Sequence, residues 1–94
     1  MARTILITGA SSGIGRMTAE LAAKRGWRVA ATARDPRSIA AANGPDFEAF
    51  ALDVTSDESI AAAVAAVVAR FGGIDVLVNN AGFGTFGALE GATA

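Results

Sequence analysis

Short apolar runs alternate along the chain with longer segments whose apolar residues recur at helical spacing. The length of the short runs, their β-branched content and the turn residues around them are typical of buried strands. These four runs cover residues 4–8, 27–33, 47–52 and 74–78.

The first helical segment covers residues 13–25, and Gly26 follows at the position of a left-handed C-terminal cap. A second helix, short and weak, starts where Asp35 can act as an N-cap and Pro36 occupies the first helical position. It ends near residues 43–45. The apolar face of the first segment holds Ile14, Met17, Thr18, Leu21 and Ala22.

The third helical segment has the clearest signals. Thr55 and Glu58 form a capping box, with a hydroxyl at the cap and a carboxylate three residues later. The glycine pair at 72–73 ends the segment. Its apolar residues at helical spacing are Ile60, Ala63, Val64, Val67, Val68 and Phe71.

Strands and helices therefore alternate, and short connections with right-handed crossovers favour a parallel sheet with helices on both faces. The predicted fold class is α/β: a Rossmann-like parallel sheet in the order 3-2-1-4, which is a truncated half of a doubly wound fold. A chain of 94 residues forms at most one small domain with a thin core.

Composition excludes several classes of function. A formal net charge of −1 provides no basic surface for nucleic acid or for an anionic membrane. The chain has no cysteine and no histidine, which excludes disulfides, thiolate or imidazole metal sites and histidine-based catalysis. It has no signal peptide and no apolar run of membrane length, so we expect a cytoplasmic location.

A glycine-rich turn joins the first apolar run to the first helical segment. Glycines adopt backbone dihedrals closed to other residues and let a ligand approach the main chain. The start of the helix offers free N–H groups and a partial positive charge to an anion. This order of strand, turn and helix predicts a phosphate-binding cradle and hence a nucleotide ligand. The candidate residues are Gly9, Ser11, Ser12, Gly13, Ile14 and Gly15.

Two motifs resemble signatures of the short-chain dehydrogenases/reductases. The turn from Thr8 to Gly15 is similar to the family's Thr-Gly-x-x-x-Gly-x-Gly motif, and residues 79–82, Asn-Asn-Ala-Gly, are similar to its second signature. The resemblance covers residues 1–94 as a single, partial NAD(P)-binding domain that is incomplete at its C-terminus. It implies a dinucleotide partner and a homo-oligomeric full-length protein.

The resemblance also implies roles at the ends of the third and fourth strands. Asp53 and the backbone N–H of Val54 would contact adenine, although Asp53 is also suited to a turn in which it binds its own backbone. Three residues after the fourth strand would line the adenosine and ribose: Asn79, Ala81 and Gly82. Asn80 is expected to bridge backbone between neighbouring strands instead.

The end of the second strand bears on the choice of cofactor. An acid there binds the ribose 2′-hydroxyl of NAD, whereas an arginine accepts the 2′-phosphate of NADP. Ala33 stands at the acid position and Arg34 follows it, so NADP is preferred over NAD. Asp35 is expected to cap the next helix, but in a longer strand its carboxylate could face the ribose.

The catalytic groups of the resembled enzymes have no counterpart here. The family's proton donor is a tyrosine, activated by a lysine four residues later. This chain has no tyrosine, and its lysine, Lys24, lies in the first helical segment. We therefore assign no catalytic or metal-binding residue and expect the isolated chain to be inactive. We also expect it to self-associate, because its fourth strand would be an apolar edge. A stand-alone nucleotide-binding or interaction module is the alternative.

Overall fold

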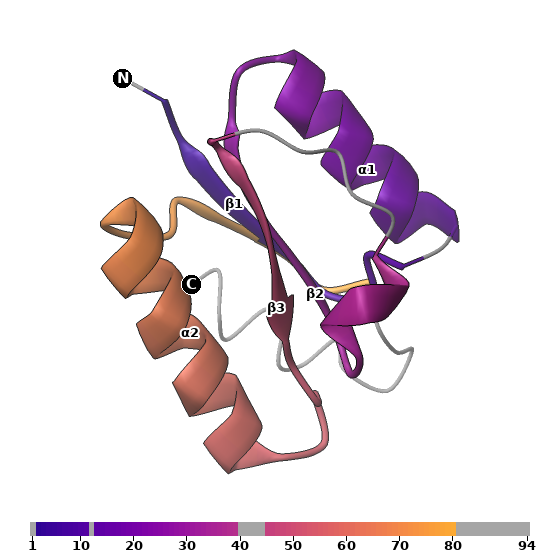
Figure 1. Cartoon of the computed structure of the whole chain (residues 1–94), viewed down its shortest axis with the longest axis vertical. Helices are drawn as coiled ribbons and strands as arrows, with labels where there is room; N and C mark the ends of the chain where they lie inside the picture. The colour runs from indigo at the N-terminus through magenta and orange to yellow at the C-terminus, as the bar shows by residue number, and fades with distance from the viewer. Residues whose placement is uncertain (1, 12, 40–44, 81–94) are drawn as a thin grey trace.

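Strands and helices alternate along the chain in the predicted order (Figure 1), but the second predicted helix is only a 3₁₀ turn, and Ile39 after it is already extended. The computed structural model describes residues 2–11, 13–39 and 45–80. Its elements are β1 (Thr4–Ile7), α1 (Gly13–Lys24), β2 (Arg28–Ala33), the 3₁₀ turn η1 (Pro36–Ser38), β3 (Phe47–Ala51), α2 (Asp57–Phe71) and β4 (Val76–Val78).

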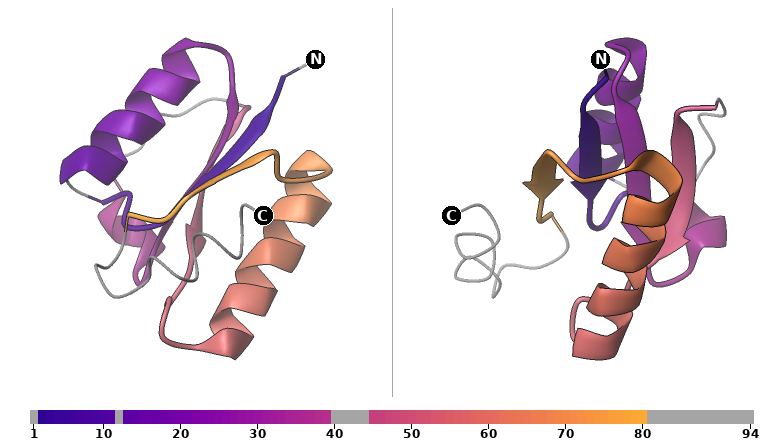
Figure 2. Two further views of the ribbon diagram at one scale, coloured as in Figure 1. Left: turned by 180° about the vertical axis from the view of Figure 1, so that it is seen from behind. Right: turned by 90° about the vertical axis from the view of Figure 1, so that its left-hand side faces the viewer.

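The strands form a parallel sheet in the order β3-β2-β1-β4, which confirms the predicted topology. The register places Ile5 of β1 beside Val29 of β2 and Val76 of β4. Helices α1 and α2 lie on opposite faces of this sheet (Figure 2). The described part of the chain is therefore a three-layer α/β unit.

Alternating side chains of the strands build a separate core on each face of the sheet. Ile5, Ile7 and Val29 point to the face that α1 covers, together with Ile39 after η1. Leu6, between the two isoleucines, points to the α2 side. A strand with both faces covered is mostly apolar, and all four residues of β1 are buried: the polar Thr4 and three apolar residues.

The apolar face predicted for α1 is only partly the face that the helix buries. Ala22 was predicted and is buried, but Ile14, Met17 and Leu21 are 71%, 67% and 52% exposed, and Ala19, which was not predicted, packs into the core. Small side chains on the inner face allow the helix to lie close to the sheet. The periodicity identified the helix correctly, but closeness to the sheet decides which of its faces is inward.

The N-terminal cap of α2 differs by one residue from the prediction. Ser56, not Thr55, is the N-cap, and its hydroxyl accepts a hydrogen bond from the backbone N–H of Ser59. The backbone N–H and hydroxyl of Thr55 both donate to Asp53 instead. The predicted end of the helix is confirmed, because Gly72 has a φ of 89° in the left-handed region and caps the C-terminus.

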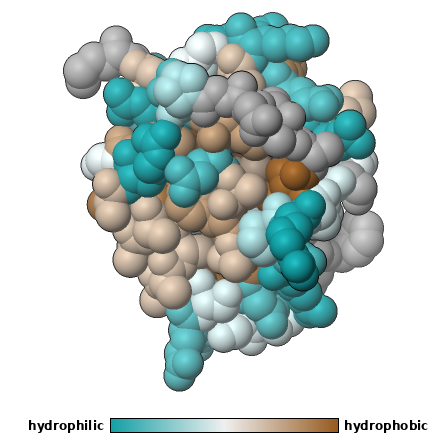
Figure 3. Space-filling view, viewed as in Figure 1, coloured by the Kyte–Doolittle hydropathy of each residue, from teal (hydrophilic) through white to brown (hydrophobic). Residues whose placement is uncertain are grey.

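The outer surface of α2 consists largely of alanine. Figure 3 shows a broad, weakly apolar surface on the side of the molecule where α2 lies. The exposed alanines of this helix are Ala61, Ala62, Ala65, Ala66 and Ala69. Within residues 2–11, 13–39 and 45–80, no helix combines the length and the apolar content needed to cross a membrane.

Two adjacent valines of α2 test which face of the helix holds the core. Val67 is fully buried, whereas Val68 is 43% exposed. We expect Val67→Ala to lower the free energy of unfolding by about 2 kcal/mol more than Val68→Ala, because it removes two buried methyl groups and leaves a cavity. Both substitutions change helix propensity equally, so the difference isolates burial. Equal midpoints in urea denaturation would contradict this assignment of the core.

Candidate functional site

A pocket opens where the carboxyl ends of the strands meet. Its volume is about 560 Å³, within the range of small-molecule sites. Each strand of the described sheet contributes to it: Gly9 follows β1, Arg34 follows β2, Leu52 follows β3 and Asn80 follows β4. The complete lining is Gly9, Ser11, Ala33, Arg34, Asp35, Ser38, Leu52, Val54 and Asn80. In open parallel sheets this edge is where ligands bind, beside the point at which the strand order reverses.

The glycine-rich turn forms the wall of the pocket next to α1. Gly9 and Gly13 have φ values of 64° and 61°, a region that non-glycine residues rarely adopt. Gly9 and Ser11 line the pocket, and α1 begins directly afterwards at Gly13. The first N–H groups of an α-helix have no partner within the helix, so this end of α1 can bind an anion. Ser12 lies outside the described residues.

Gly15 permits the closest contact between α1 and the end of β1. A Cβ atom on Gly15 would overlap the carbonyl oxygen of Gly9 and lie 2.7 Å from Nδ2 of Asn80. Ile14, next to it, is largely exposed. The absence of a side chain at Gly15 therefore lets the helix approach the sheet.

A network of hydrogen bonds fixes the end of β1 to the end of β4. The Thr8 hydroxyl accepts from the backbone N–H of Asn80 at 2.8 Å and donates to Oδ1 of Asn79 at 3.0 Å. The side-chain amide of Asn80 donates to the Gly9 carbonyl at 3.4 Å. Asn80 thus bridges neighbouring strand ends, as predicted. Ala81 and Gly82 lie outside the described residues.

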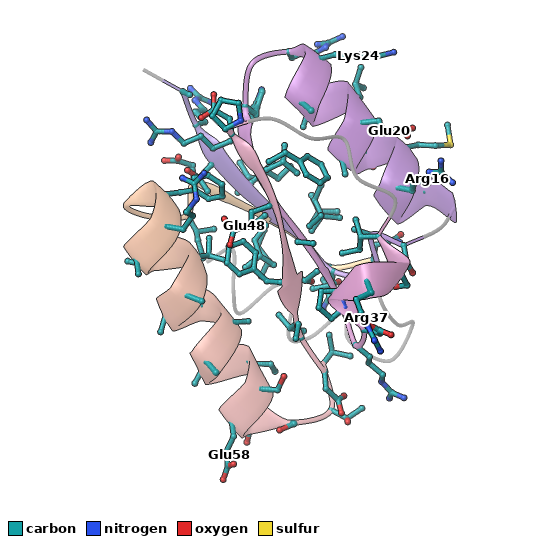
Figure 4. All side chains as sticks on the ribbon, in the orientation of Figure 1. Arg16, Glu20, Lys24, Arg37, Glu48 and Glu58 are labelled. Atoms are coloured by element: carbon teal, nitrogen blue, oxygen red, sulfur yellow. The ribbon has the colours of Figure 1, made fainter. Side chains whose placement is uncertain are left out.

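Arg34 and Asp35 follow β2 and both line the pocket. Nε of Arg34 lies 3.7 Å from Oδ1 of Asp53, and its side chain is 74% exposed. Asp35 caps η1, as predicted, and Arg37 binds both of its oxygens, with Nε at 3.0 Å and Nη2 at 3.1 Å. Figure 4 shows Arg37 beside η1, at the end of the molecule away from Lys24. Because β2 ends at Ala33, the longer strand that would turn Asp35 toward a ribose does not form.

Asp53 forms a turn with its own chain. Its Oδ1 accepts the N–H of Thr55 at 2.9 Å and the Thr55 hydroxyl at 2.6 Å. These two hydrogen bonds, the hydroxyl first, hold the pKa of the Asp53 carboxyl below its ordinary value, with a smaller contribution from Arg34. Val54 lines the pocket. The alternative role considered for Asp53, that of a turn residue, is the one its contacts show.

Five residues of the pocket were not among the predicted site residues, and for two of these, Ser38 and Leu52, the sequence suggested no role at the site. Leu52 is buried at the end of β3, and the Ser38 hydroxyl in η1 donates to the Asp35 carbonyl at 2.6 Å. Both follow strands that the apolar pattern located, so their position after those strands could have indicated that they line the pocket. In the part of the chain that the structure describes, no three acidic, histidine or cysteine side chains are grouped as metal ligands.

The parallel sheet with helices on both faces is a Rossmann-like α/β architecture, and comparison with known proteins identifies the family. The model of the short chain dehydrogenase family matches residues 3–93. The chain therefore belongs to the short-chain dehydrogenase family.

Individual relatives agree with this assignment. The chain is 45% identical over 85 residues to a serine 3-dehydrogenase from Agrobacterium fabrum, covering 87% of this chain and 34% of that protein. It is 44% identical to a 3-ketodihydrosphingosine reductase from Bacteroides thetaiotaomicron, covering 95% of this chain and 32% of the relative. The solved structure of a short-chain dehydrogenase from Streptomyces avermitilis superimposes with a TM-score of 0.80 at 49% identity, covering 86% of this chain and 30% of that one. The chain thus spans about a third of the length of these proteins.

The contact at Gly15 predicts that replacing this helical glycine by alanine lowers the free energy of unfolding, which is the opposite of the usual effect. Replacing a helical glycine by alanine ordinarily stabilises a protein by up to about 1 kcal/mol. We expect Gly15→Ala to lower the free energy of unfolding by about 1–3 kcal/mol, because the new methyl group would overlap the Gly9 carbonyl. Gly73→Ala is the control, since a Cβ there meets no atom within 4 Å. If chemical denaturation shows Gly15→Ala to be stabilising, α1 does not lie this close to β1.

The Asp53 turn predicts a dependence on pH. Thr55→Val should raise the pKa of Asp53 toward its ordinary value, because the Thr55 hydroxyl is the main cause of the lowered pKa. Since the folded-state pKa is depressed, the turn's contribution to stability is complete above the unfolded pKa of about 3.9 and is lost as the pH falls through the folded value. Carboxyl ¹³C NMR titration measures the change. Thr55→Ser keeps the hydroxyl and should leave the pKa low, and identical titrations of the Val and Ser variants would refute the assignment.

Proposed function

We propose that this chain is the NADP(H)-binding N-terminal portion of a short-chain dehydrogenase/reductase. The complete protein would transfer a hydride between NADP(H) and a carbonyl or alcohol substrate. The observation that carries the proposal is the pocket at the carboxyl ends of the strands, with the start of α1 on one side and Arg34 on another.

The start of α1 fits the diphosphate of a dinucleotide. Gly9 and Ser11 line the pocket, and positive φ angles at Gly9 and Gly13 turn the backbone into the helix. The main-chain N–H groups that follow, with the positive end of the helix dipole, are suited to an anion. In this proposal Ser11, Ser12, Gly13 and Ile14 surround the diphosphate, while Gly15 brings the helix to the sheet.

The end of β2 fits a phosphorylated ribose. Arg34 lines the pocket with its side chain 74% exposed, so its guanidinium is accessible to a ligand. A planar guanidinium binds a phosphate dianion through two parallel hydrogen bonds. Asp35 and Asp53 are both engaged in turns of their own chain. These contacts favour NADP over NAD. Val54, Asn79, Ala81 and Gly82 would border the adenosine, and Asp53 remains a candidate for adenine through its second oxygen.

The residues of this chain supply binding and orientation. The bound nicotinamide would supply the hydride chemistry. With no tyrosine in the sequence, the chain lacks the proton donor of the family it belongs to. Lys24 lies at the C-terminal end of α1, remote from the pocket (Figure 4).

The role of Arg34 predicts a selective loss of affinity. We expect Arg34→Ala to weaken binding of NADP⁺ by about tenfold, the effect of one charge-assisted phosphate contact, and to change NAD⁺ binding by less than about twofold. Isothermal titration calorimetry with both dinucleotides measures the two affinities. Arg25→Ala is the control, because Arg25 follows α1 at the opposite end of the strands.

Three outcomes of this titration bear on the proposal. Absence of binding of either dinucleotide to the unaltered chain would refute nucleotide binding altogether. Equal affinities of the unaltered chain for NADP⁺ and NAD⁺ would refute the NADP preference. An equal loss for both ligands in Arg34→Ala would remove Arg34 from the 2′-phosphate.

A further inference from the structure

The end of β2 carries two arginines and one carboxylate within four residues, but their relation to the pocket differs. Arg34 and Asp35 line the pocket, and Arg37 does not. Arg37 instead contacts Asp35 through three hydrogen bonds, one from its backbone N–H at 3.0 Å and two from its guanidinium. This pairing offsets the negative charge that Asp35 contributes to the pocket wall.

Asp35 is the acid best placed to change the choice of cofactor. It lines the same pocket as Arg34 and follows it directly in the chain. A carboxylate with a free oxygen at this place would accept hydrogen bonds from ribose hydroxyls and repel a phosphate dianion. In the structure both oxygens are bound to Arg37, Oδ1 at 3.0 Å from Nε and Oδ2 at 3.1 Å from Nη2.

We propose that Arg37 determines cofactor preference without contacting the cofactor. It does so by holding the Asp35 carboxylate in a bidentate ion pair. Arg34 is then the charge that faces the ligand at the end of β2. Arg37 is a positioning residue in this arrangement, and Asp35 is the group through which it acts. The inference rests on the proposed function, because it concerns the 2′ position of a nucleotide in the same pocket.

The local backbone favours this pairing. Asp35 caps η1, and Pro36 fixes the backbone between the two partners, so the Arg37 N–H and side chain lie on the same side as the carboxylate. The side-chain hydrogen bonds from Arg37 are the main cause of a lowered pKa at Asp35, which agrees with the pairing that the distances show. The Arg37 side chain is otherwise 89% exposed, so replacing it removes no core packing.

Substitution at Arg37 tests the proposal. Arg37→Ala should lower the ratio of NADP⁺ to NAD⁺ affinity by about fivefold, because an unpaired carboxylate then repels the 2′-phosphate across a solvent-screened distance. The same shift should appear between 2′,5′-ADP and 5′-AMP, because the two differ only in the 2′-phosphate and neither contains the nicotinamide. Arg37→Lys keeps the charge but loses the two-pronged geometry, and it should give an intermediate ratio.

A double variant separates action through Asp35 from direct contact. Adding Asp35→Asn to Arg37→Ala removes the unpaired carboxylate and keeps a good N-cap, so the ratio should return to within about twofold of the original. If the ratio of NADP⁺ to NAD⁺ affinity stays low in the double variant, Arg37 contacts the phosphate itself and the proposal is wrong. If Arg37→Ala leaves the ratio unchanged while both nucleotides still bind, this inference fails and the proposed function stands. If the unaltered chain binds neither nucleotide, the proposed function itself is overturned.

Discussion

The contact between the start of α1 and the end of β1 is the constraint on which the rest of the structure depends. Gly15 lies so close to the Gly9 carbonyl that there is no room for a Cβ atom. This approach turns the small residues of α1 inward, to Ala19 and Ala22, and leaves its larger apolar side chains outside. It also brings the helix N-terminus to the strand ends. One steric condition therefore sets both the packing of this layer and the position of the main-chain N–H groups at the start of α1.

Hydrogen bonds from β4 hold that contact in place from the other side. The Thr8 hydroxyl joins the two asparagines that follow β4, and the Asn80 amide reaches the Gly9 carbonyl. In the described part of the chain, every buried side-chain nitrogen and oxygen has a hydrogen-bond partner. Polar groups at the junction of β1 and β4 thus have structural roles, and most residues that line the pocket lie at or after the ends of β2 and β3.

The apolar pattern was sufficient for the fold, and less so for details that depend on neighbouring segments. It located each strand to within about two residues, and it predicted the parallel order because strands and helices alternate. It misjudged the inward face of α1, since side-chain size does not reveal how closely a helix approaches a sheet. It placed the cap of α2 at Thr55, because nothing local says that Asp53 will take that hydroxyl. The pairing of Asp35 with Arg37 likewise depends on a turn geometry that the sequence only outlines.

The walls of the pocket come from segments far apart in the chain, and this has a thermodynamic consequence. Gly9 and Asn80, which meet there, are separated by 71 positions in sequence. An unfolded chain cannot present these walls together, so a ligand of the pocket binds the native state almost exclusively. Occupancy is then linked to folding: at a hundred times its dissociation constant, a ligand raises the free energy of unfolding by about 2.7 kcal/mol. For a domain with so thin a core, this would be a substantial part of the whole stability, so a ligand of this pocket would also act as a structural component.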